Sequence, residues 1–178
     1  MNQLKQTENP KFCLTASGCL IHQHKVMLIK HKKVKFWLCP GGHIEDNELP
    51  HQAAEREFWE ETGIKVKAKP FGLMESLGDT QQLPSPFSTN LHWVCRENFE
   101  RRIKDPRHYQ LVSEWSKGCE KHLNFMYLVE AVGSLDFKEN VEETDGIAWF
   151  REDELDELET LSAIREEVKN AFKVVKGF

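Results

Sequence analysis

Short apolar runs separated by polar turns dominate the chain and predict a series of β-strands. The predicted strands cover residues 12–21, 25–30, 36–39, 66–77, 123–132 and 146–150. The second run is continuously apolar from Val26 to Ile29, which is typical of a strand inside a sheet. Pro40 ends the third run because it lacks a backbone N–H donor, and the flexible Gly41 and Gly42 follow it.

Two other segments repeat their apolar residues at the spacing of a helix. Residues 50–62 are expected to form the first helix, because Pro50 suits the first helical position and Gly63 is a natural stop. The second pattern has spacings of three and four and consists of Leu155, Leu158, Leu161, Ile164, Val168, Phe172 and Val175. Strands interleaved with two helices predict one α/β domain over residues 1–178, built in α/β/α layers. Residues 79–121 show no regular pattern and are expected to be an irregular insertion.

Composition and charge narrow the class of protein. With 178 residues, 39% hydrophobic and 30% charged, the chain is expected to fold as one soluble domain. A net charge of -5 argues against coating nucleic acid through bulk electrostatics, but it permits a small phosphorylated ligand in a local site. The polar start of the chain and the lack of a long apolar run lead us to expect a cytoplasmic protein without a membrane partner.

The five cysteines indicate no metal site by their spacing. They are Cys13, Cys19, Cys39, Cys95 and Cys119, an odd number without a Cys-x-x-Cys pair. We therefore expect reduced, buried thiols and no zinc site.

Three glutamates carry the clearest chemical signal. Glu57, Glu60 and Glu61 have the spacing i, i+3 and i+4, so their carboxylates project from one face of the predicted helix. Such carboxylates repel one another, and a divalent cation with oxygen ligands relieves that repulsion. A close approach at Gly41 and Gly42 would let a main-chain carbonyl join the ligands. Taken alone, however, glutamates at this spacing are also common on solvated helix faces.

Arg56 precedes the cluster by one residue. It lies about 100° around the helix from Glu57, so it is expected to reach back to Glu48 in the preceding loop. This pair would hold the loop against the helix and fix the positions of the carboxylates. Such rigid placement matters for a reaction in which water and phosphate are positioned around a metal ion.

The full pattern at fixed spacing matches the Nudix box. The nine specified positions are occupied by Gly42, Glu48, Arg56, Glu57, Phe58, Glu60, Glu61, Gly63 and Ile64. The chain therefore resembles the Nudix hydrolase superfamily, which implies an α/β/α sandwich with a mixed β-sheet. One local departure is Leu49, which stands where many members have a Ser or Thr that caps the helix.

The resemblance also implies roles for these residues. Glu57, Glu60 and Glu61, with the carbonyl of Gly41, would be ligands of Mg²⁺ or Mn²⁺, and Arg56 and Glu48 would be the structural pair. The general base would be one of the helix glutamates or a residue of a later loop. Glu142 and Glu143 are the later-loop candidates, and the alternative for both is a solvated acidic turn.

The reaction implied is attack of water at phosphorus in a nucleoside diphosphate derivative or a nucleoside triphosphate. Arg96, Arg101 and Arg102 are candidates for contacts to the substrate, although a charge-rich loop is more often simply solvated.

The alternative is a Nudix module that binds a nucleotide or an RNA end without significant turnover. All box carboxylates are retained, which favours the enzyme. An RNA-end-processing enzyme would need a more basic surface, and an isomerase has no support in these motifs. Many relatives form homodimers, and no segment of this sequence decides whether this chain does.

Overall fold

The computed structural model describes residues 9–70 and 78–177 of the chain. Within these ranges, the strands are β1 (Phe12–His22), β2 (Lys25–His31), β3 (Trp37–Leu38), β4 (Gly41–His43), β5 (Val66–Ala68), β6 (Ser88–Trp93), β7 (Lys121–Ala131) and β8 (Thr144–Arg151). The helical segments are α1 (Pro50–Thr62), α2 (Arg96–Lys104), η1 (Ser113–Trp115), η2 (Glu152–Asp156) and α3 (Ser162–Lys176). Among the described residues, no helix is long and apolar enough to cross a membrane.

The sheet is mixed, and β1 and β7 form its centre. They run parallel, in a register that extends from Phe12 opposite Lys121 to Leu20 opposite Val129. β2 and β4 pair antiparallel with β1, and β5 and β6 pair antiparallel with β7. β2 in turn pairs antiparallel with β3 and β8. The mixed sheet expected from the resemblance is therefore present.

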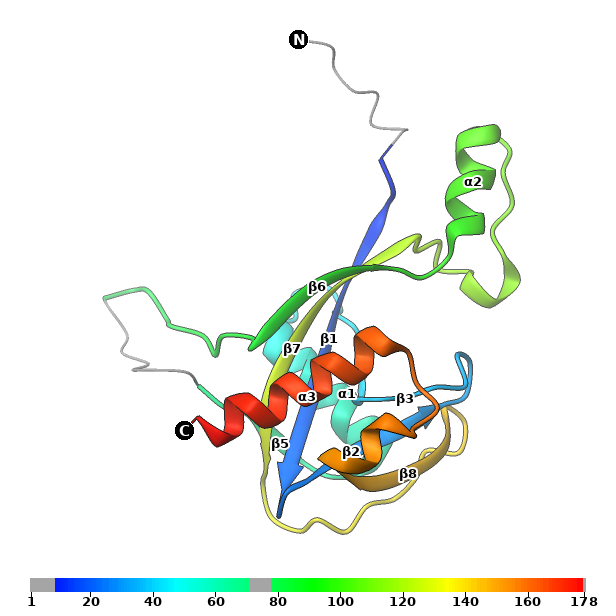
Figure 1. The fold of residues 1–178 in the computed structure, drawn as a ribbon. Helices are drawn as coiled ribbons and strands as arrows, with labels where there is room; N and C mark the ends of the chain where they lie inside the picture. The colour runs from blue at the N-terminus through cyan, green and yellow to red at the C-terminus, as the bar shows by residue number, and fades with distance from the viewer. Residues whose placement is uncertain (1–8, 71–77, 178) are drawn as a thin grey trace.

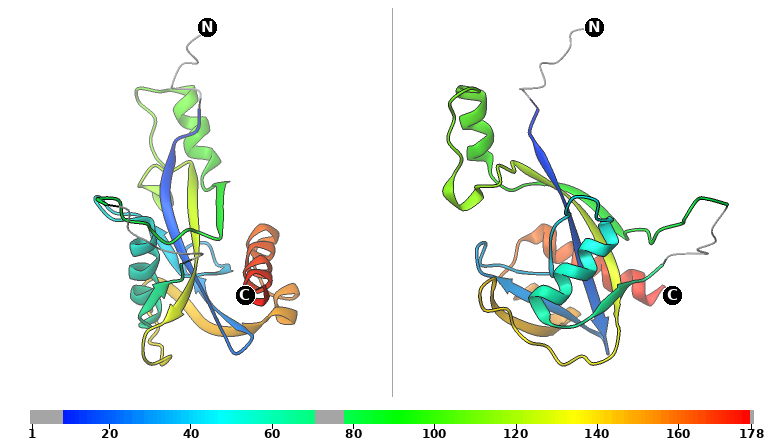
Figure 2. Two further views of the ribbon diagram at one scale, coloured as in Figure 1. Left: turned by 90° about the vertical axis from the view of Figure 1, so that its left-hand side faces the viewer. Right: turned by 180° about the vertical axis from the view of Figure 1, so that it is seen from behind.

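Helices cover both faces of this sheet, α1 on one side and α3 on the other (Figures 1 and 2). Alternation along β1 explains the two cores, since successive side chains of a strand point to opposite faces. Ala16 and Leu20 pack in the cluster that contains Phe58 of α1, whereas Cys19 packs in the cluster that contains Phe172 of α3. The α/β/α layering predicted from the sequence is confirmed.

The C-terminal helical pattern is divided into two pieces. η2 ends at Asp156, and α3 begins only at Ser162. Between them the chain bonds to the edge strand β3: the N–H of Trp37 donates to the carbonyl of Glu159 at 3.1 Å, and Thr160 Oγ1 donates to the carbonyl of Trp37 at 2.6 Å. These tertiary hydrogen bonds interrupt the helix that the apolar spacing predicted from Leu155 onward.

Residues 79–121 are more regular than expected. β6 pairs with β7 from Ser88 opposite Met126 to Trp93 opposite Lys121, and α2 follows it. The prediction of an irregular insertion was wrong over residues 88–104, because β6 is stabilised by its pairing with β7 and has no apolar pattern of its own. The strand expected at residues 66–77 is present as Val66–Ala68, and residues 71–77 lie outside the described part of the chain.

The expectation that all cysteines are reduced thiols was wrong for two of them. Cys13 and Cys119 form a disulfide across 106 residues, whereas Cys19, Cys39 and Cys95 are free and buried. The parallel pairing of β1 and β7 brings the starts of these two strands together. The spacing of the cysteines along the chain does not indicate that pairing.

Candidate functional site

α1 positions the three glutamates, and its two ends explain where it begins and stops. Leu49 supplies no side-chain cap, as expected, but its N–H donates to Gln52 Oε1 at 3.0 Å. At the other end, Gly63 has a φ of 74° and donates its N–H to the carbonyl of Trp59 at 2.7 Å. A left-handed conformation of this kind favours glycine, which accounts for Gly63 in the sequence pattern.

The Arg56 guanidinium joins the loop before α1 to the carboxylates on it. Its Nε and Nη2 donate to the two oxygens of Glu48 at 2.8 and 2.9 Å, which is the contact expected from the sequence. Nη2 also donates to the carbonyl of His43 at 2.9 Å. Nη1 donates to Glu57 at 2.8 Å and to Glu60 at 2.9 Å. The Arg56 hydrogen bond holds the pKa of Glu48 below its ordinary value.

Glu61 is the buried member of the cluster. It is 3% exposed, and its carboxylate accepts the N–H of Gly41 at 2.9 Å. Burial raises the pKa of Glu61 to about 8, and the negative charges of Glu57, Glu143 and Glu60 act in the same direction. Burial also raises the pKa of Glu57, against the opposing effect of Arg56.

The two glycines before the box bring the backbone close to these carboxylates. A Cβ on Gly42 would overlap the carboxylate of Glu57, and one on Gly41 would overlap the backbone of β1 at Ala16. β4 is therefore packed tightly between α1 and β1. This close approach is the one that the sequence pattern required of Gly41 and Gly42.

The donor set fits a divalent cation. Among the described residues, the Gly41 N–H is the one hydrogen-bond donor to the Glu61 carboxylate, although three other carboxylates act on it electrostatically. A buried carboxylate that is raised in pKa by its neighbours is a costly arrangement unless positive charge is brought among them. Oxygen ligands of this kind suit hard cations such as Mg²⁺.

The two later-loop glutamates differ in their relation to the cluster. Both are exposed and lie in the turn before β8. The charge of Glu143 raises the pKa of Glu57 and of Glu61, so Glu143 lies within electrostatic reach of the cluster. Its backbone carbonyl accepts the N–H of Lys32 at 2.9 Å, which anchors this turn to the end of β2. This electrostatic effect on Glu57 and Glu61 distinguishes Glu143 from Glu142.

The candidate substrate-binding arginines lie elsewhere. α2, which carries them, stands beyond the end of the sheet and away from α1 (Figures 1 and 2). Arg102 is 4% exposed and its Nη2 donates to Glu120 at 2.8 Å, so it cannot contact a substrate without breaking a buried ion pair. Arg101 pairs with Glu97, and the Arg96 guanidinium lies 4.6 Å from the ring centre of Trp93. The structure does not bring these arginines to the glutamate cluster.

A polar stripe on the α3 side of the sheet was missed by the sequence reasoning. Thr15 and Ser17 of β1 both donate hydroxyl hydrogen bonds of 3.1 Å to Asn124 Oδ1 of β7. Ser88 and Asn90 of β6 both donate to Glu167 of α3 at 2.7 Å. The alternation of polar residues at 88, 90 and 92 was the available signal. It becomes meaningful only when β6 is placed beside β7.

Comparisons with known proteins support the fold and the family suggested by the sequence motif. The sequence is similar to "Probable DHNTP pyrophosphohydrolase" of Lactococcus lactis subsp. cremoris, with 36% identity over 86 residues, 48% of this chain and 49% of that protein. It is similar to "8-oxo-dGTP diphosphatase" of Proteus vulgaris, with 43% identity over 56 residues, 29% of this chain and 50% of that protein. The chain thus spans about half the length of the curated relatives that it matches.

Solved structures extend the similarity over nearly the whole chain. A NUDIX family hydrolase from Clostridium perfringens superposes with a TM-score of 0.68 and 26% identity, covering 91% of this chain and 97% of that one. A C. elegans Ap4A hydrolase has a TM-score of 0.60 at 14% identity, covers 93% of this chain and 99% of that one, and supports the fold alone. The family model of the NUDIX domain matches residues 13–172 of this chain. The chain therefore belongs to the NUDIX domain family.

Proposed function

We propose that the protein is a metal-dependent hydrolase that cleaves a diphosphate linkage in a nucleoside diphosphate derivative or a nucleoside triphosphate. The observation that carries the proposal is the buried carboxylate of Glu61, held beside Glu57 and Glu60 on one face of α1. Two matched relatives are named as a pyrophosphohydrolase and a diphosphatase, which supports the same type of reaction.

Members of this family generally use divalent metal ions, and the proposed ion here is Mg²⁺ or Mn²⁺. Glu57, Glu60 and Glu61 would hold it, together with the carbonyl of Gly41. When bound, the ion would supply positive charge to the phosphate oxygens and make water a better nucleophile. The high pKa of Glu61 would then return toward its ordinary value, because a cation favours the ionised carboxylate.

The remaining residues of the site would position the carboxylates and deprotonate the attacking water. Arg56 holds Glu48, Glu57 and Glu60 through its guanidinium, which limits the freedom of the carboxylates and of the loop. Glu143, in the turn before β8, would accept the proton of the attacking water. General-base catalysis by a positioned carboxylate contributes about 10²–10⁴-fold to a rate.

The experiment is to measure cleavage of a panel of nucleoside triphosphates, sugar nucleotides and dinucleotides with Mg²⁺ and with Mn²⁺. Wild type, Glu61→Gln and Glu55→Gln are compared. Glu55 lies on the same helix, but it pairs with Lys67 and accepts the N–H of Ala68 at 3.0 Å, so it is the matched control. We expect one substrate class to be cleaved by wild type and Glu55→Gln, and at least a hundredfold slower by Glu61→Gln.

The binding module without turnover makes a different prediction. A folded wild type that binds the metal and a nucleotide but cleaves no member of the panel would support it and contradict the hydrolase. A cytoplasmic location stays a prediction, and so does a homodimer of the kind that many relatives form.

A further inference from the structure

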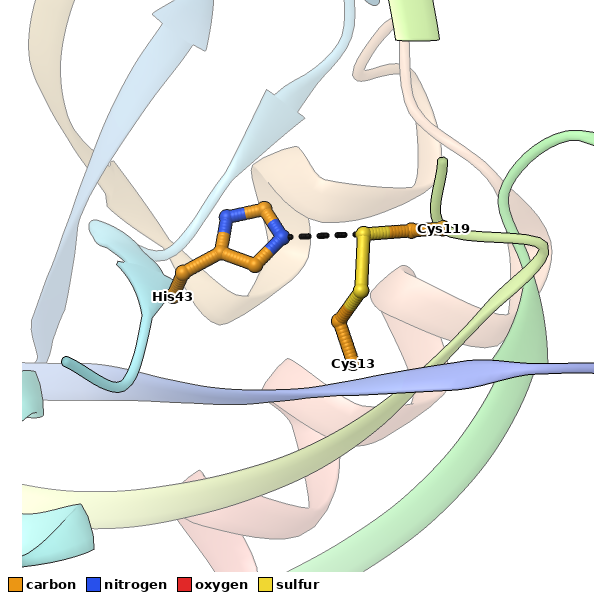
Figure 3. Close-up of side chains that lie close together, drawn as sticks. All are labelled: Cys13, His43 and Cys119. Atoms are coloured by element: carbon orange, nitrogen blue, oxygen red, sulfur yellow. Dashed lines mark hydrogen bonds between the residues drawn. A yellow bond between two sulfur atoms is a disulfide. The ribbon is translucent and has the colours of Figure 1, made fainter. Parts of the chain in front are cut away.

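Three side chains with soft ligand atoms converge on the α3 side of the sheet, outside the glutamate cluster. Cys13 belongs to β1, His43 to β4, and Cys119 lies two residues before β7. Their ligand atoms all lie within 4.8 Å of one another. His43 Nε2 is 3.2 Å from Cys119 Sγ, and the ring points at the disulfide between the two cysteines (Figure 3).

We propose that the dithiol form of Cys13 and Cys119, together with His43, binds a divalent cation of the Zn²⁺ class. The disulfide in the structure is the oxidised form of the same pair of cysteines. A dithiol reductant converts it by giving two electrons and two protons, and is itself oxidised to a disulfide. Binding of the cation then releases the two thiol protons to solvent, which leaves two thiolates and one neutral imidazole as ligands.

The backbone already has the geometry that such a site requires. The Cα atoms of Cys13 and Cys119 are 5.7 Å apart, and the parallel pairing of β1 with β7 holds them there. Zn–S bonds of about 2.3 Å in tetrahedral geometry need sulfur atoms about 3.8 Å apart. Rotation of the two side chains about Cα–Cβ supplies that separation without movement of the strands.

The surroundings favour thiolates and place a second imidazole beside His43. The positive charges of Lys117 and Lys33 both act on His43, so they would also stabilise two thiolates beside it. The ring of His122 lies 5.0 Å from the ring of His43, centre to centre. Its Nε2 is buried and has no hydrogen-bond partner among the described residues. Burial lowers the pKa of His122 to about 3, so the ring is neutral and has a lone pair to donate.

This site differs from the proposed active site in ligand chemistry. Sulfur and imidazole nitrogen select Zn²⁺-like cations, whereas the carboxylates of α1 suit Mg²⁺ or Mn²⁺. The two sites share β4, because the carbonyl of His43 accepts a hydrogen bond from Arg56. The proposal does not depend on the proposed hydrolysis, and its test requires no turnover.

The test uses Co²⁺ as a spectroscopic substitute, in the presence of excess Mg²⁺ to occupy the carboxylates. Wild-type protein is reduced, freed of reductant under anaerobic conditions, and titrated with Co²⁺. We expect a thiolate-to-cobalt charge-transfer band that saturates at one equivalent and is abolished by one equivalent of Zn²⁺. Protein with the disulfide intact should show no band, and this comparison requires no variant.

Variants then assign the ligands. Cys13→Ser and Cys119→Ser should each lose the band, and His43→Ala should weaken Co²⁺ binding at least tenfold. Cys95→Ser is the matched control, since Cys95 is a buried free thiol that caps α2, and it should keep the band. Circular dichroism confirms that each variant is folded. Reduced wild type without a band, or a band that persists in the double variant Cys13→Ser/Cys119→Ser, would overturn the proposal.

Discussion

The N–H of Gly41 donates a 2.9 Å hydrogen bond to the carboxylate of Glu61, across the boundary between β4 and α1. This is the contact through which the glycine pair and the buried glutamate of the sequence motif meet. It also gives a carboxylate that is 3% exposed one backbone hydrogen-bond donor. The hydrogen bond opposes the effect of burial on the pKa of Glu61 but does not cancel it.

The raised pKa of Glu61 predicts a pH-dependent stability of the metal-free protein. The pKa in the folded state is about 8, against an ordinary value of 4.5, so the folded protein binds this proton more tightly than the unfolded chain. The resulting stabilisation is complete below the unfolded pKa and is lost as the pH rises through the folded one. With a chelator present, the Tm of wild type should fall relative to Glu61→Gln as the pH is raised. Added Mg²⁺ should reverse this difference in Tm. If the Tm values of wild type and Glu61→Gln change in parallel with pH, the raised pKa of Glu61 is contradicted.

Replacing Arg56 should be costly even when the charge is kept. Lysine cannot form the paired hydrogen bonds to Glu48 together with those to Glu57 and His43. We expect Arg56→Lys to lower the free energy of unfolding by about 1–3 kcal/mol and to reduce kcat/KM as well. Arg101→Lys is the control, since its exposed pair with Glu97 contributes about 0–1 kcal/mol. If urea denaturation gives Arg56→Lys and Arg101→Lys the same loss in free energy of unfolding, the prediction is wrong.

Two adjacent glutamates should differ in their effect on activity. Glu143 acts electrostatically on Glu57 and Glu61, so Glu143→Gln should lower kcat by about a hundredfold and remove the acidic limb of the pH–rate profile. Glu142→Gln, in the same exposed turn, should leave kcat within about twofold. A normal pH profile for Glu143→Gln would assign the general base to one of the helix glutamates.

The Arg102–Glu120 pair should matter for stability and not for substrate. Both side chains are buried, at 5% and 1% exposure. Removing the Glu120 carboxylate takes away this buried ion pair with Arg102, so Glu120→Leu should destabilise the protein by about 3–5 kcal/mol. The double variant Arg102→Met/Glu120→Leu should recover most of that loss and keep the wild-type KM. A raised KM in the folded double variant would instead restore Arg102 as a substrate contact.

Some of this protein could be predicted from local sequence alone. The face shared by Glu57, Glu60 and Glu61 follows from helical spacing, and the start and end of α1 follow from Pro50 and Gly63. The Arg56–Glu48 contact spans eight residues, so one loop and one helix determine it. These features depend on neighbours close along the chain, where spacing translates directly into geometry.

Other features were decided by tertiary structure. β6 becomes a strand because β7 offers it partners, and the helix predicted from Leu155 is broken because Glu159 and Thr160 bond to Trp37. The same holds for the convergence of Cys13, His43 and Cys119, since the starts of β1 and β7 and the end of β4 must be brought together before these side chains can meet. The sequence by itself determined the chemistry of α1. Only the pairing of distant strands decided which thiols, rings and loop carboxylates lie near one another, because that pairing depends on the packing of the whole sheet.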